Sequence, residues 1–286
     1  MRQLIYVIVG FFLTSFSSSA QSDVCESAGA QVIALGGAVT EMIYALGEED
    51  RIVGVDVTST VPSDTSKLPK LGYYRSVGAE GLLSLGPDMI IADPDAGPPE
   101  ALGQVSSVGV CIRKVGRGGS AQAVLDRVNQ IASALNIPEK GKELRVELAA
   151  EFDDAENLVA LKKKSQPAPK ILFLLSAKDG APVAAGQDTD ANAIIELAGG
   201  INAVSGFTGY KPLSSEVAAS SAADYILMMS HVVQGSGGKE AILSLPQLQL
   251  TPAGKNGNLI SMDGLLLLGF GPRTPAAIKS LTQQIF

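Results

Sequence analysis

The sequence predicts an α/β protein with two Rossmann-like lobes, joined by one long helix and separated by a cleft. Three observations predict this fold. Short apolar runs alternate with helical stretches in both halves of the chain, a long charged stretch of helical composition separates the halves, and a motif of the first half has a weaker echo in the second. We therefore divide the chain into an N-terminal segment at 1–20, a lobe at 21–137, a linking helix at 138–166 and a second lobe at 167–286.

The repeated motif combines a glycine–tyrosine turn with a short helix and an apolar strand. The first copy contains Gly72-Tyr73-Tyr74-Arg75, Glu80 and Asp88, and the second contains Gly209-Tyr210-Lys211, Glu216 and Asp224. In both copies the glutamate precedes the aspartate by eight residues. An internal repeat of this kind indicates two lobes of similar architecture. If the lobes face each other, the two tyrosine turns line one ligand cleft.

The first twenty residues have the pattern of a secretory signal peptide rather than of a folded element. Arg2 precedes an apolar run at 4–13, and Ser18-Ser19-Ala20 is a small-residue cleavage site before Gln21. The alternative is a membrane anchor, for which the apolar run is short. No cysteine follows the run directly, so a lipid anchor at the cleavage site is not expected.

Composition excludes several classes of function. The chain carries 22 Lys and Arg against 29 Asp and Glu, so it is acidic and is not expected to bind nucleic acid. His231 is its single histidine, which excludes a multi-histidine metal site. Cys25 and Cys111 are the two cysteines, and in an exported chain they form either a disulfide or two unpaired thiols.

The first lobe is expected to contain four strands, each a short apolar run bounded by turn residues. The runs are Val32–Leu35, Ile52–Val55, Met89–Ala92 and 110–115. Thr40 is the expected N-cap of the helix after the first strand, and Gly47 lies just beyond the end of that helix. Further helices are expected around Glu80 and up to Val108, and Ser120 is expected to cap one that ends at Leu135.

Residues 138–164 are expected to form one long helix. The stretch is highly charged and free of internal proline, and only Gly141 weakens it. Its apolar face comprises Leu144, Leu148, Phe152, Ala155, Leu158 and Leu161. This length allows the helix to bridge two lobes, and the alternative is an ordinary surface helix.

The second lobe repeats the alternation. Strands are expected at 170–174, Tyr225–Met229 and Leu259–Met262, with helices at 191–198 and around Glu216. His231 follows the strand at 225–229 almost directly. Thr274 is the expected cap of the last helix, with Pro275 at its first position.

Signatures of enzymes are weak in this chain. Gly-x-Ser-x-Gly is absent, and Gly116-Arg117-Gly118-Gly119-Ser120 matches neither a P-loop nor a dinucleotide fingerprint. Asp93 and Asp95 could form a carboxylate pair, but in a Gly/Pro loop they are interpreted as turn formers. The residues therefore favour ligand binding over catalysis.

The tyrosine turns suggest one specific chemistry. A phenolate is a known ligand of haem iron, but tyrosine titrates near pH 10 and needs a nearby cation to ionise at neutral pH. Arg75 lies two residues from Tyr73 and could supply this charge. The alternative is that Tyr73 and Tyr74 are amphipathic surface residues. His231 either points into the cleft or sits satisfied at the end of its strand.

The chain resembles the periplasmic haem-binding proteins of bacterial haem ABC importers, in the long-helix class that also carries siderophores and cobalamin. The resemblance covers nearly the whole chain after the signal segment. It rests on Leu71-Gly72-Tyr73-x-Arg75, Ala79-Glu80-Gly81-x-Leu83-Ser84-Leu85, Ala181-Pro182-Val183-Ala184-Ala185-Gly186, Leu197-Ala198-Gly199-Gly200-x-Asn202, Gly209-Tyr210-Lys211-Pro212-Leu213-Ser214 and Leu267-Leu268-Gly269-Phe270-Gly271-Pro272-Arg273-Thr274.

The resemblance implies roles for individual residues. Tyr73 is implied as the axial ligand of haem iron, with Arg75 close to the haem. Haem-contacting residues are then expected at Tyr74, Tyr210, Lys211, His231 and Arg273. Glu80 and Glu216 are implied as docking carboxylates for arginines of the permease, although both also fit first-turn stabilisation of a helix.

One position departs from the family pattern. Relatives often carry an arginine shortly after the strand that precedes the Gly-rich loop, where this chain has His231. An arginine there would stabilise a tyrosinate. We therefore expect His231 to be either the partner of Tyr73 or a second iron ligand.

These expectations describe a periplasmic protein that takes up haem as its transported ligand, delivers it to an ABC permease with its ATPase, and performs no catalysis. We expect a monomer with no nucleic-acid partner. The alternatives are a siderophore or cobalamin carrier of the same class and an exported α/β enzyme that acts on a small anionic substrate.

Overall fold

The computed structural model describes Cys25 and residues 30–178 and 182–286. The expected signal peptide at 1–20 lies outside these residues. Within the described ranges, no helix has both the length and the apolar character needed to cross a membrane.

The first lobe is built on a parallel four-stranded sheet in the order β2-β1-β3-β4. Its strands are β1 (Val32–Leu35), β2 (Ile52–Val55), β3 (Met89–Ala92) and β4 (Cys111–Lys114). Every residue of β1 and β3 is buried, as expected of central strands in a parallel sheet covered on both faces. In the register, Val32 lies opposite Met89.

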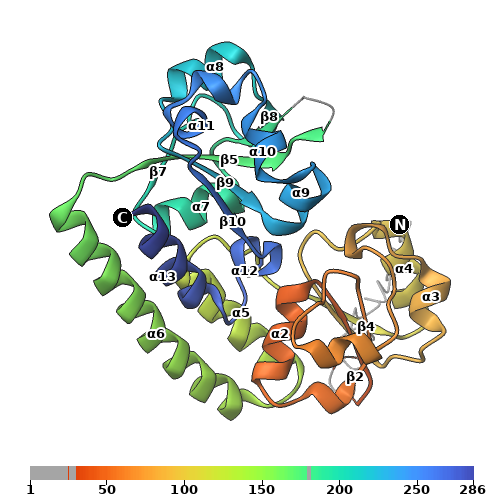
Figure 1. Cartoon of the computed structure of the whole chain (residues 1–286). Helices are drawn as coiled ribbons and strands as arrows, with labels where there is room; N and C mark the ends of the chain where they lie inside the picture. Colours follow the sequence, from red (N-terminus) through yellow and green to blue (C-terminus); the bar gives the residue numbers. More distant parts are fainter. Residues whose placement is uncertain (1–24, 26–29, 179–181) are drawn as a thin grey trace, which may run out of the picture.

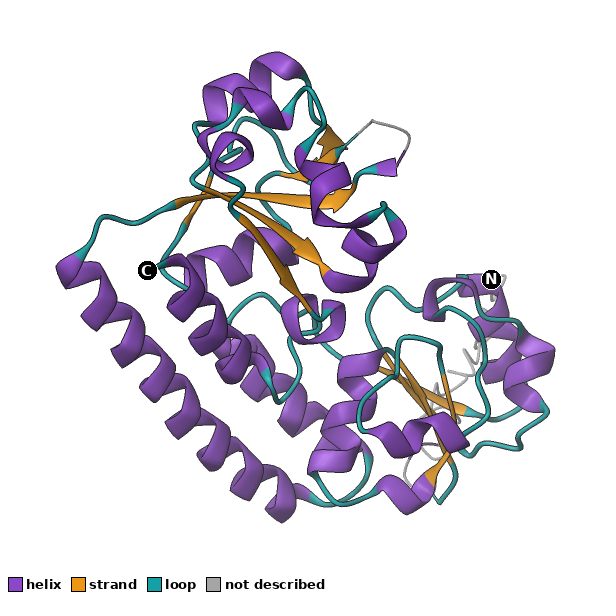
Figure 2. Ribbon diagram, in the orientation of Figure 1, coloured by secondary structure: helices purple, strands orange, loops and turns teal. Residues whose placement is uncertain are grey.

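Helices follow the strands of this lobe in the expected alternation (Figure 2). They are α2 (Gly37–Ala45), α3 (Ala79–Leu83), α4 (Pro99–Ser107) and α5 (Ala121–Ala134), with 3-10 turns at η1 (Glu49–Arg51), η2 (Ser63–Lys67) and η3 (Tyr74–Ser76). Ser120 caps α5 as expected, because its side chain accepts a hydrogen bond from the Ala123 N–H. The expected cap at Thr40 is wrong. Helix α2 begins at Gly37, and the Thr40 hydroxyl instead lies 2.7 Å from that of Ser59.

The linking helix α6 (Pro138–Ser165) is a single helix, as expected, and packs against α5 and against the C-terminal helix α13 (Figure 1). Its apolar face is narrower than expected, because Leu161 is 65% exposed. Gly141 has a packing role. A Cβ atom at this position would overlap the Cβ of Ala132 on α5, so the glycine permits close contact between the two helices.

The second lobe contains a six-stranded sheet in the order β10-β9-β5-β6-β8, with β7 paired to β5. The strands are β5 (Lys170–Ser176), β6 (Val183–Ala185), β7 (Ile201–Asn202), β8 (Tyr210–Pro212), β9 (Tyr225–Met229) and β10 (Leu259–Met262). Strands β5, β9 and β10 are parallel as expected, whereas β6 and β8 form an antiparallel extension. The assignment of Tyr210 to a turn is therefore wrong, because the turn lies at Gly209 and Tyr210 begins a strand.

Short helices surround this second sheet. They are α7 (Asp190–Leu197), α8 (Ser215–Ser221), α9 (Ser230–Gly235), α10 (Gly238–Leu243), α11 (Pro252–Asn256), α12 (Gly264–Leu268) and α13 (Thr274–Ile285), with a 3-10 turn at η5 (Leu248–Leu250). Thr274 is the first residue of α13 rather than its N-cap. Its hydroxyl donates to the Gly271 carbonyl, which lies before the helix.

The sequence repeat corresponds to a matched set of hydrogen bonds in the two lobes. Asp88 exchanges two hydrogen bonds with Gln31, one through its carboxylate and one through its backbone N–H, at 3.0 and 2.9 Å. Asp224 makes the same two bonds with Lys170, at 2.7 and 2.8 Å. In each lobe the aspartate thus ties the start of one central strand to its neighbour.

The interior of the molecule is continuous between the lobes. One cluster of buried residues includes Met89 of β3 and Phe173 of β5, and it runs through α5, α6 and α13. Cys25 and Cys111 form a disulfide, which decides between the two alternatives left open by the sequence. The bridge ties Cys25 to the edge strand β4.

Candidate ligand-binding cleft

Two glycines in the left-handed region present the two tyrosine turns. Gly72 has φ 82° and Gly209 has φ 74°, and no atom lies within 4 Å of a Cβ built at either position. The requirement for glycine is therefore conformational rather than steric. Tyr73 follows the first turn and is 43% exposed, and Tyr210 follows the second and is also exposed.

The neighbouring tyrosines Tyr73 and Tyr74 differ in their surroundings. Their rings meet edge to face with centroids 4.8 Å apart. Tyr74 is half-buried, and its phenol oxygen accepts a hydrogen bond of 3.1 Å from Arg75 Nε. Burial, together with the charge of Asp93, raises the pKa of Tyr74, and Arg75 only partly opposes this. Tyr74 is therefore a neutral phenol near pH 7.

Arg75 has a different direct partner from the one that the sequence suggested. It bonds to Tyr74, and its Nη2 donates to Asp95 at 2.8 Å. Burial lowers the pKa of Arg75, but Tyr74, Tyr73 and Asp95 together outweigh this effect, and the pKa is raised. Arg75 thus places positive charge beside both tyrosines.

The loop after β3 carries two carboxylates that sequence reasoning interpreted as turn formers. Asp93 does form a turn, because its Oδ1 accepts the backbone N–H of Asp95 at 3.0 Å. Both carboxylates also hold arginines. Asp95 accepts from Arg75 and Arg117, and Asp93 Oδ2 accepts from Arg127 at 3.3 Å.

Arg127 is a buried charged residue whose contacts the sequence did not reveal. It lies on α5 with 2% of its surface exposed, and its Nη1 donates to the carbonyls of Gly269 and Phe270 at 3.2 and 3.3 Å. Because Asp93 belongs to the first lobe and the 269–270 loop follows α12 of the second, Arg127 joins the two lobes. In the sequence of an amphipathic helix, the spacing of polar and apolar residues does not distinguish a buried arginine from one on the surface.

The second lobe contributes a polar group around Tyr210. Burial and the charge of Asp190 raise the pKa of Tyr210, while Arg75 and a hydrogen bond with the Thr189 side chain lower it. Burial also raises the pKa of Asp190, against the opposing charge of Arg117. Lys211 lies apart from this group, with its Nζ 5.2 Å from the centre of the Phe207 ring.

Two other expected ligand-contacting residues have different surroundings. His231 is exposed at the start of α9, and a Cβ at Gly264 would lie 3.0 Å from its Cε1. Among the described residues, no hydrogen bond, ion pair or ring contact joins His231 to Tyr73. Arg273 is engaged elsewhere, because its Nε donates to Glu41 of α2 at 2.9 Å. This contact is a second connection between the lobes.

Comparison with known proteins identifies the family of this fold. Residues 32–265 match the family model described as periplasmic binding protein. The chain belongs to the periplasmic binding protein family. The fold class expected from the sequence, two α/β lobes joined by one helix, is thereby confirmed.

Solved structures similar to this periplasmic binding protein include two heme-binding proteins. BhuT, in complex with two hemes, is 38% identical, with 89% of this chain and 97% of that chain covered and a TM-score of 0.86. RhuT from Roseiflexus sp. RS-1 in apo form is 36% identical, with coverages of 90% and 98% and a TM-score of 0.85. A Vitamin B12-binding protein of Vibrio vulnificus is 26% identical over 272 residues, 95% of this chain and 94% of that protein.

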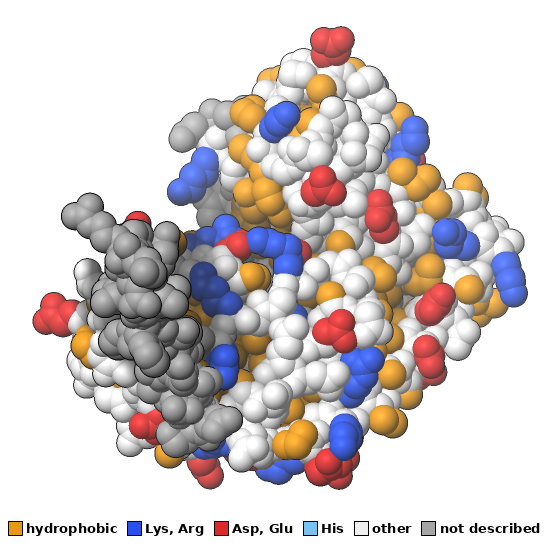
Figure 3. Space-filling view, turned by 180° about the vertical axis from the view of Figure 1, so that it is seen from behind, with side chains coloured by type: hydrophobic (Ala, Val, Ile, Leu, Met, Phe, Trp, Pro, Cys, Tyr) orange, Lys and Arg blue, Asp and Glu red, His pale blue; other side chains and the backbone are white. Residues whose placement is uncertain are grey.

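The candidate docking carboxylates of this periplasmic binding protein occupy equivalent places. Glu80 lies in the first turn of α3 and Glu216 in the first turn of α8, and both are exposed. Figure 1 shows these helices at the outer ends of the two lobes. Seen from behind, Lys and Arg side chains gather in the hollow where the lobes meet (Figure 3).

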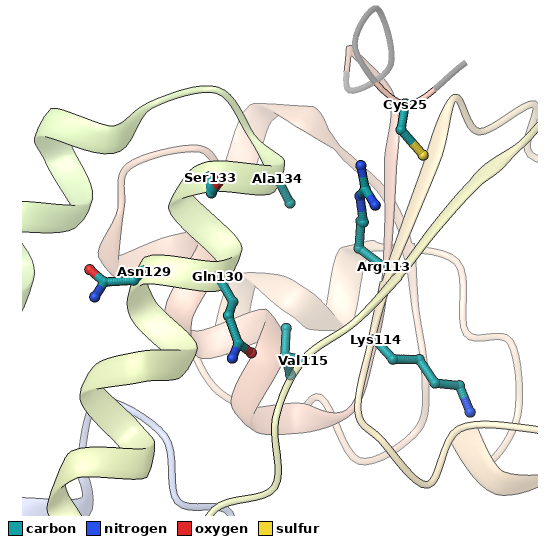
Figure 4. A pocket seen from close by; sticks show the side chains of 8 residues that line it. All are labelled: Cys25, Arg113, Lys114, Val115, Asn129, Gln130, Ser133 and Ala134. Atoms are coloured by element: carbon teal, nitrogen blue, oxygen red, sulfur yellow. The ribbon is translucent and has the colours of Figure 1, made fainter. Parts of the chain in front are cut away.

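A separate pocket of about 410 Å³ lies outside the cleft, between β4 and α5 (Figure 4). It is lined by Cys25, Arg113, Lys114, Val115, Asn129, Gln130, Ser133 and Ala134. None of the residues expected to contact the ligand lines it. The pocket is thus distinct from the two tyrosine turns.

Proposed function

We propose that this protein captures haem in the cleft between its two lobes, in the periplasm, and delivers it to an ABC permease and its ATPase. One observation carries the proposal. An exposed tyrosine, Tyr73, is held on a glycine turn beside Arg75 in a chain that is 38% identical to a heme-binding protein of the same fold. The protein acts as a binding protein and not as an enzyme.

Tyr73 is the residue that we assign as the axial ligand of haem iron. Its neighbour Tyr74 is already hydrogen-bonded to Arg75, and its raised pKa keeps it protonated. The exposed phenol of Tyr73 can ionise on binding iron, because the metal and Arg75 both favour the anion. Tyr74 supports Tyr73 through the ring contact.

The opposing lobe supplies the second wall of the site. We assign Tyr210 and Lys211 to contacts with the far face or edge of the haem. We assign His231 as a polar partner near the site, and its replacement by alanine should alter the haem spectrum. Arg273 would have to leave Glu41 to reach a ligand, so we assign it to the connection between lobes.

The test is an absorption titration of residues 21–286 with ferric haem. The wild type should show a saturable Soret change with the charge-transfer bands of a high-spin phenolate complex. Tyr73→Phe should lose these bands, whereas Tyr74→Phe, the matched control one residue away, should keep them. Absence of saturable binding by the wild type would overturn the proposal.

A cobalamin carrier is the second candidate, favoured by the similarity to the Vitamin B12-binding protein of Vibrio vulnificus. The same titration with cyanocobalamin discriminates between them. Tight cobalamin binding that is unaffected by Tyr73→Phe, with no haem binding, would favour this second function.

We assign Glu80 and Glu216 to docking on the permease. Replacing both with glutamine should leave haem affinity unchanged and slow haem transfer to permease-containing proteoliposomes. Glu100 and Glu240 are matched controls, because they also lie in first turns of helices. If the wild type, the Glu80/Glu216 variant and the Glu100/Glu240 control transferred haem at equal rates, the docking assignment would be contradicted.

A further inference from the structure

We propose that Arg117 acts together with Arg75 as a clamp for the carboxylate groups of the ligand, with Asp95 holding the two guanidinium groups side by side. The inference rests on the proposed function, since haem carries two propionate carboxylates. Arg117 lies in the Gly-rich loop that matched no nucleotide-binding motif in the sequence. The ion pair of Arg117 with Asp95 brings that loop next to Arg75.

The loop at 116–120 lies where the two lobes meet. A Cβ at Gly118 would overlap the Phe270 side chain, and a Cβ at Gly119 would lie 3.9 Å from Ala193 of α7. The start of the loop is fixed because the Gly116 N–H donates to Gln130 Oε1 at 2.6 Å. The glycine at 118 therefore lets the loop pack directly against Phe270 of the second lobe, and Gly119, with φ 104°, provides the turn that follows.

Asp95 bridges the two arginines with its two oxygen atoms. Oδ2 accepts from Arg75 Nη2 at 2.8 Å, and Oδ1 accepts from Arg117 Nη2. The bridge brings together two cations that would otherwise repel each other. Asp95 is itself oriented by the bond from its own backbone N–H to Asp93.

The bridge leaves donor capacity for a ligand. Each guanidinium gives one nitrogen to Asp95, and Arg75 also gives its Nε to Tyr74. Because a guanidinium has five N–H donors, both arginines keep donors for a ligand. The side chain of Arg75 is 50% exposed and that of Arg117 is 60% exposed. Two cations on one carboxylate retain a net positive charge, and the planar forks suit bidentate binding of carboxylates.

Asp190 is the first residue of α7, the helix whose Ala193 lies next to the 116–120 loop. Burial raises the pKa of Asp190, and the charge of Arg117 opposes this increase. A ligand carboxylate that binds Arg117 brings negative charge toward Asp190. Proton uptake by Asp190, which its raised pKa favours, would relieve the repulsion.

A purely structural role for Arg117 makes a different prediction. The Arg117 side chain is 60% exposed and Asp95 keeps its second partner, Arg75, so removal of the Arg117 charge should affect stability only slightly. Arg117→Gln should therefore fold normally. If Arg117→Gln weakens the binding only of ligands that carry free carboxylates, Arg117 acts in ligand binding and not merely in folding.

The experiment compares ferric protoporphyrin IX with its dimethyl ester, which keeps the iron and the ring but has no free carboxylate. Wild type, Arg117→Gln and the control Arg113→Gln are titrated as residues 21–286. Arg113 lies on β4 but lines the separate pocket, so its variant removes the same charge away from the cleft. Arg117→Gln should lose roughly tenfold or more in affinity for the diacid and nothing for the ester.

Arg117→Lys should fall between wild type and Arg117→Gln for the diacid, because it keeps the charge and loses the planar fork. Wild-type affinity of Arg117→Gln for the diacid would overturn the clamp. An equal loss for diacid and ester would also overturn it. If the wild type bound neither porphyrin, the proposed function itself would fail. If Arg117→Gln kept the wild-type preference for the diacid over the ester, only the clamp would fail.

Discussion

At Tyr74 a single side chain combines burial, a hydrogen bond and a neighbouring cation. Because the pKa of Tyr74 is raised, the phenol keeps its proton to a higher pH in the folded protein than in the unfolded chain. The associated stabilisation is present below the unfolded value near pH 10, and it is lost as the pH rises through the folded pKa.

We predict that this phenol titrates above pH 10 in the folded protein. The difference in tyrosinate absorbance between wild type and Tyr74→Phe should show one group that ionises above the ordinary tyrosine range. The same difference measured in guanidinium chloride should show a titration near pH 10, which serves as the control. A folded-state titration near pH 10 would contradict the prediction.

The contacts of individual side chains are the feature that the sequence predicts least well. The positions of Tyr73 and Arg75 on one turn follow from the glycine, but the direct bond from Arg75 to Tyr74 depends on the placement of Asp95. Asp95 comes from another loop, and its partner Arg117 comes from a third. Such a cluster arises only in the folded chain, so local spacing cannot predict it.

At the scale of elements, Gly141 shows that packing decides whether a glycine-to-alanine substitution stabilises or destabilises the protein. Alanine would favour the helix by up to about 1 kcal/mol over glycine. At Gly141 of α6, however, the added methyl group would overlap Ala132 of α5. The contact between these helices supports the junction of the lobes.

We predict that Gly141→Ala lowers the free energy of unfolding by about 1–2 kcal/mol, because overpacking outweighs helix propensity. Gly103→Ala is the matched control, since Gly103 lies within α4 and has no atom within 4 Å of its Cβ position. The control should be neutral or stabilised in guanidinium chloride unfolding. If Gly141→Ala were stabilised as much as Gly103→Ala, α5 would have to move to make room for the added methyl group, and the prediction would be contradicted.

Elements with a long or fully buried pattern could be predicted from the sequence. Strands β1, β2 and β3 agree with their apolar runs at both ends, and α6 agrees within a residue of the expected end. The three-residue strands β6 and β8 escaped prediction, because an alternation cannot be read over three residues. Tyr210 was consequently assigned to a turn although it begins β8.

On the scale of the whole molecule, the lobes are connected by more than the linking helix. The buried cluster continues from β3 to β5, and Arg127 and the Glu41–Arg273 pair cross the junction. Extensive burial at a junction of this kind limits the relative motion of the lobes. We therefore expect ligand binding to close the cleft only slightly.

We predict that Arg127→Ala destabilises the protein by about 2–4 kcal/mol, because it leaves Asp93 and two carbonyls without their buried partner. Arg145→Ala is the control, as its pair with Asp126 is exposed and should contribute less than about 1 kcal/mol. Chemical denaturation followed by circular dichroism measures both. Equal effects of the two changes would contradict a connecting role for Arg127.

The disulfide between Cys25 and Cys111 has a practical consequence for anyone who prepares this protein. It closes a loop with a sequence separation of 86 residues, and three strands of the first lobe lie within that loop. Loop closure on this scale stabilises a fold by about 4–5 kcal/mol in the chain-entropy view. A preparation from a reducing cytosol would begin without that contribution, and adding dithiothreitol to an oxidised sample should reproduce its lower denaturation midpoint.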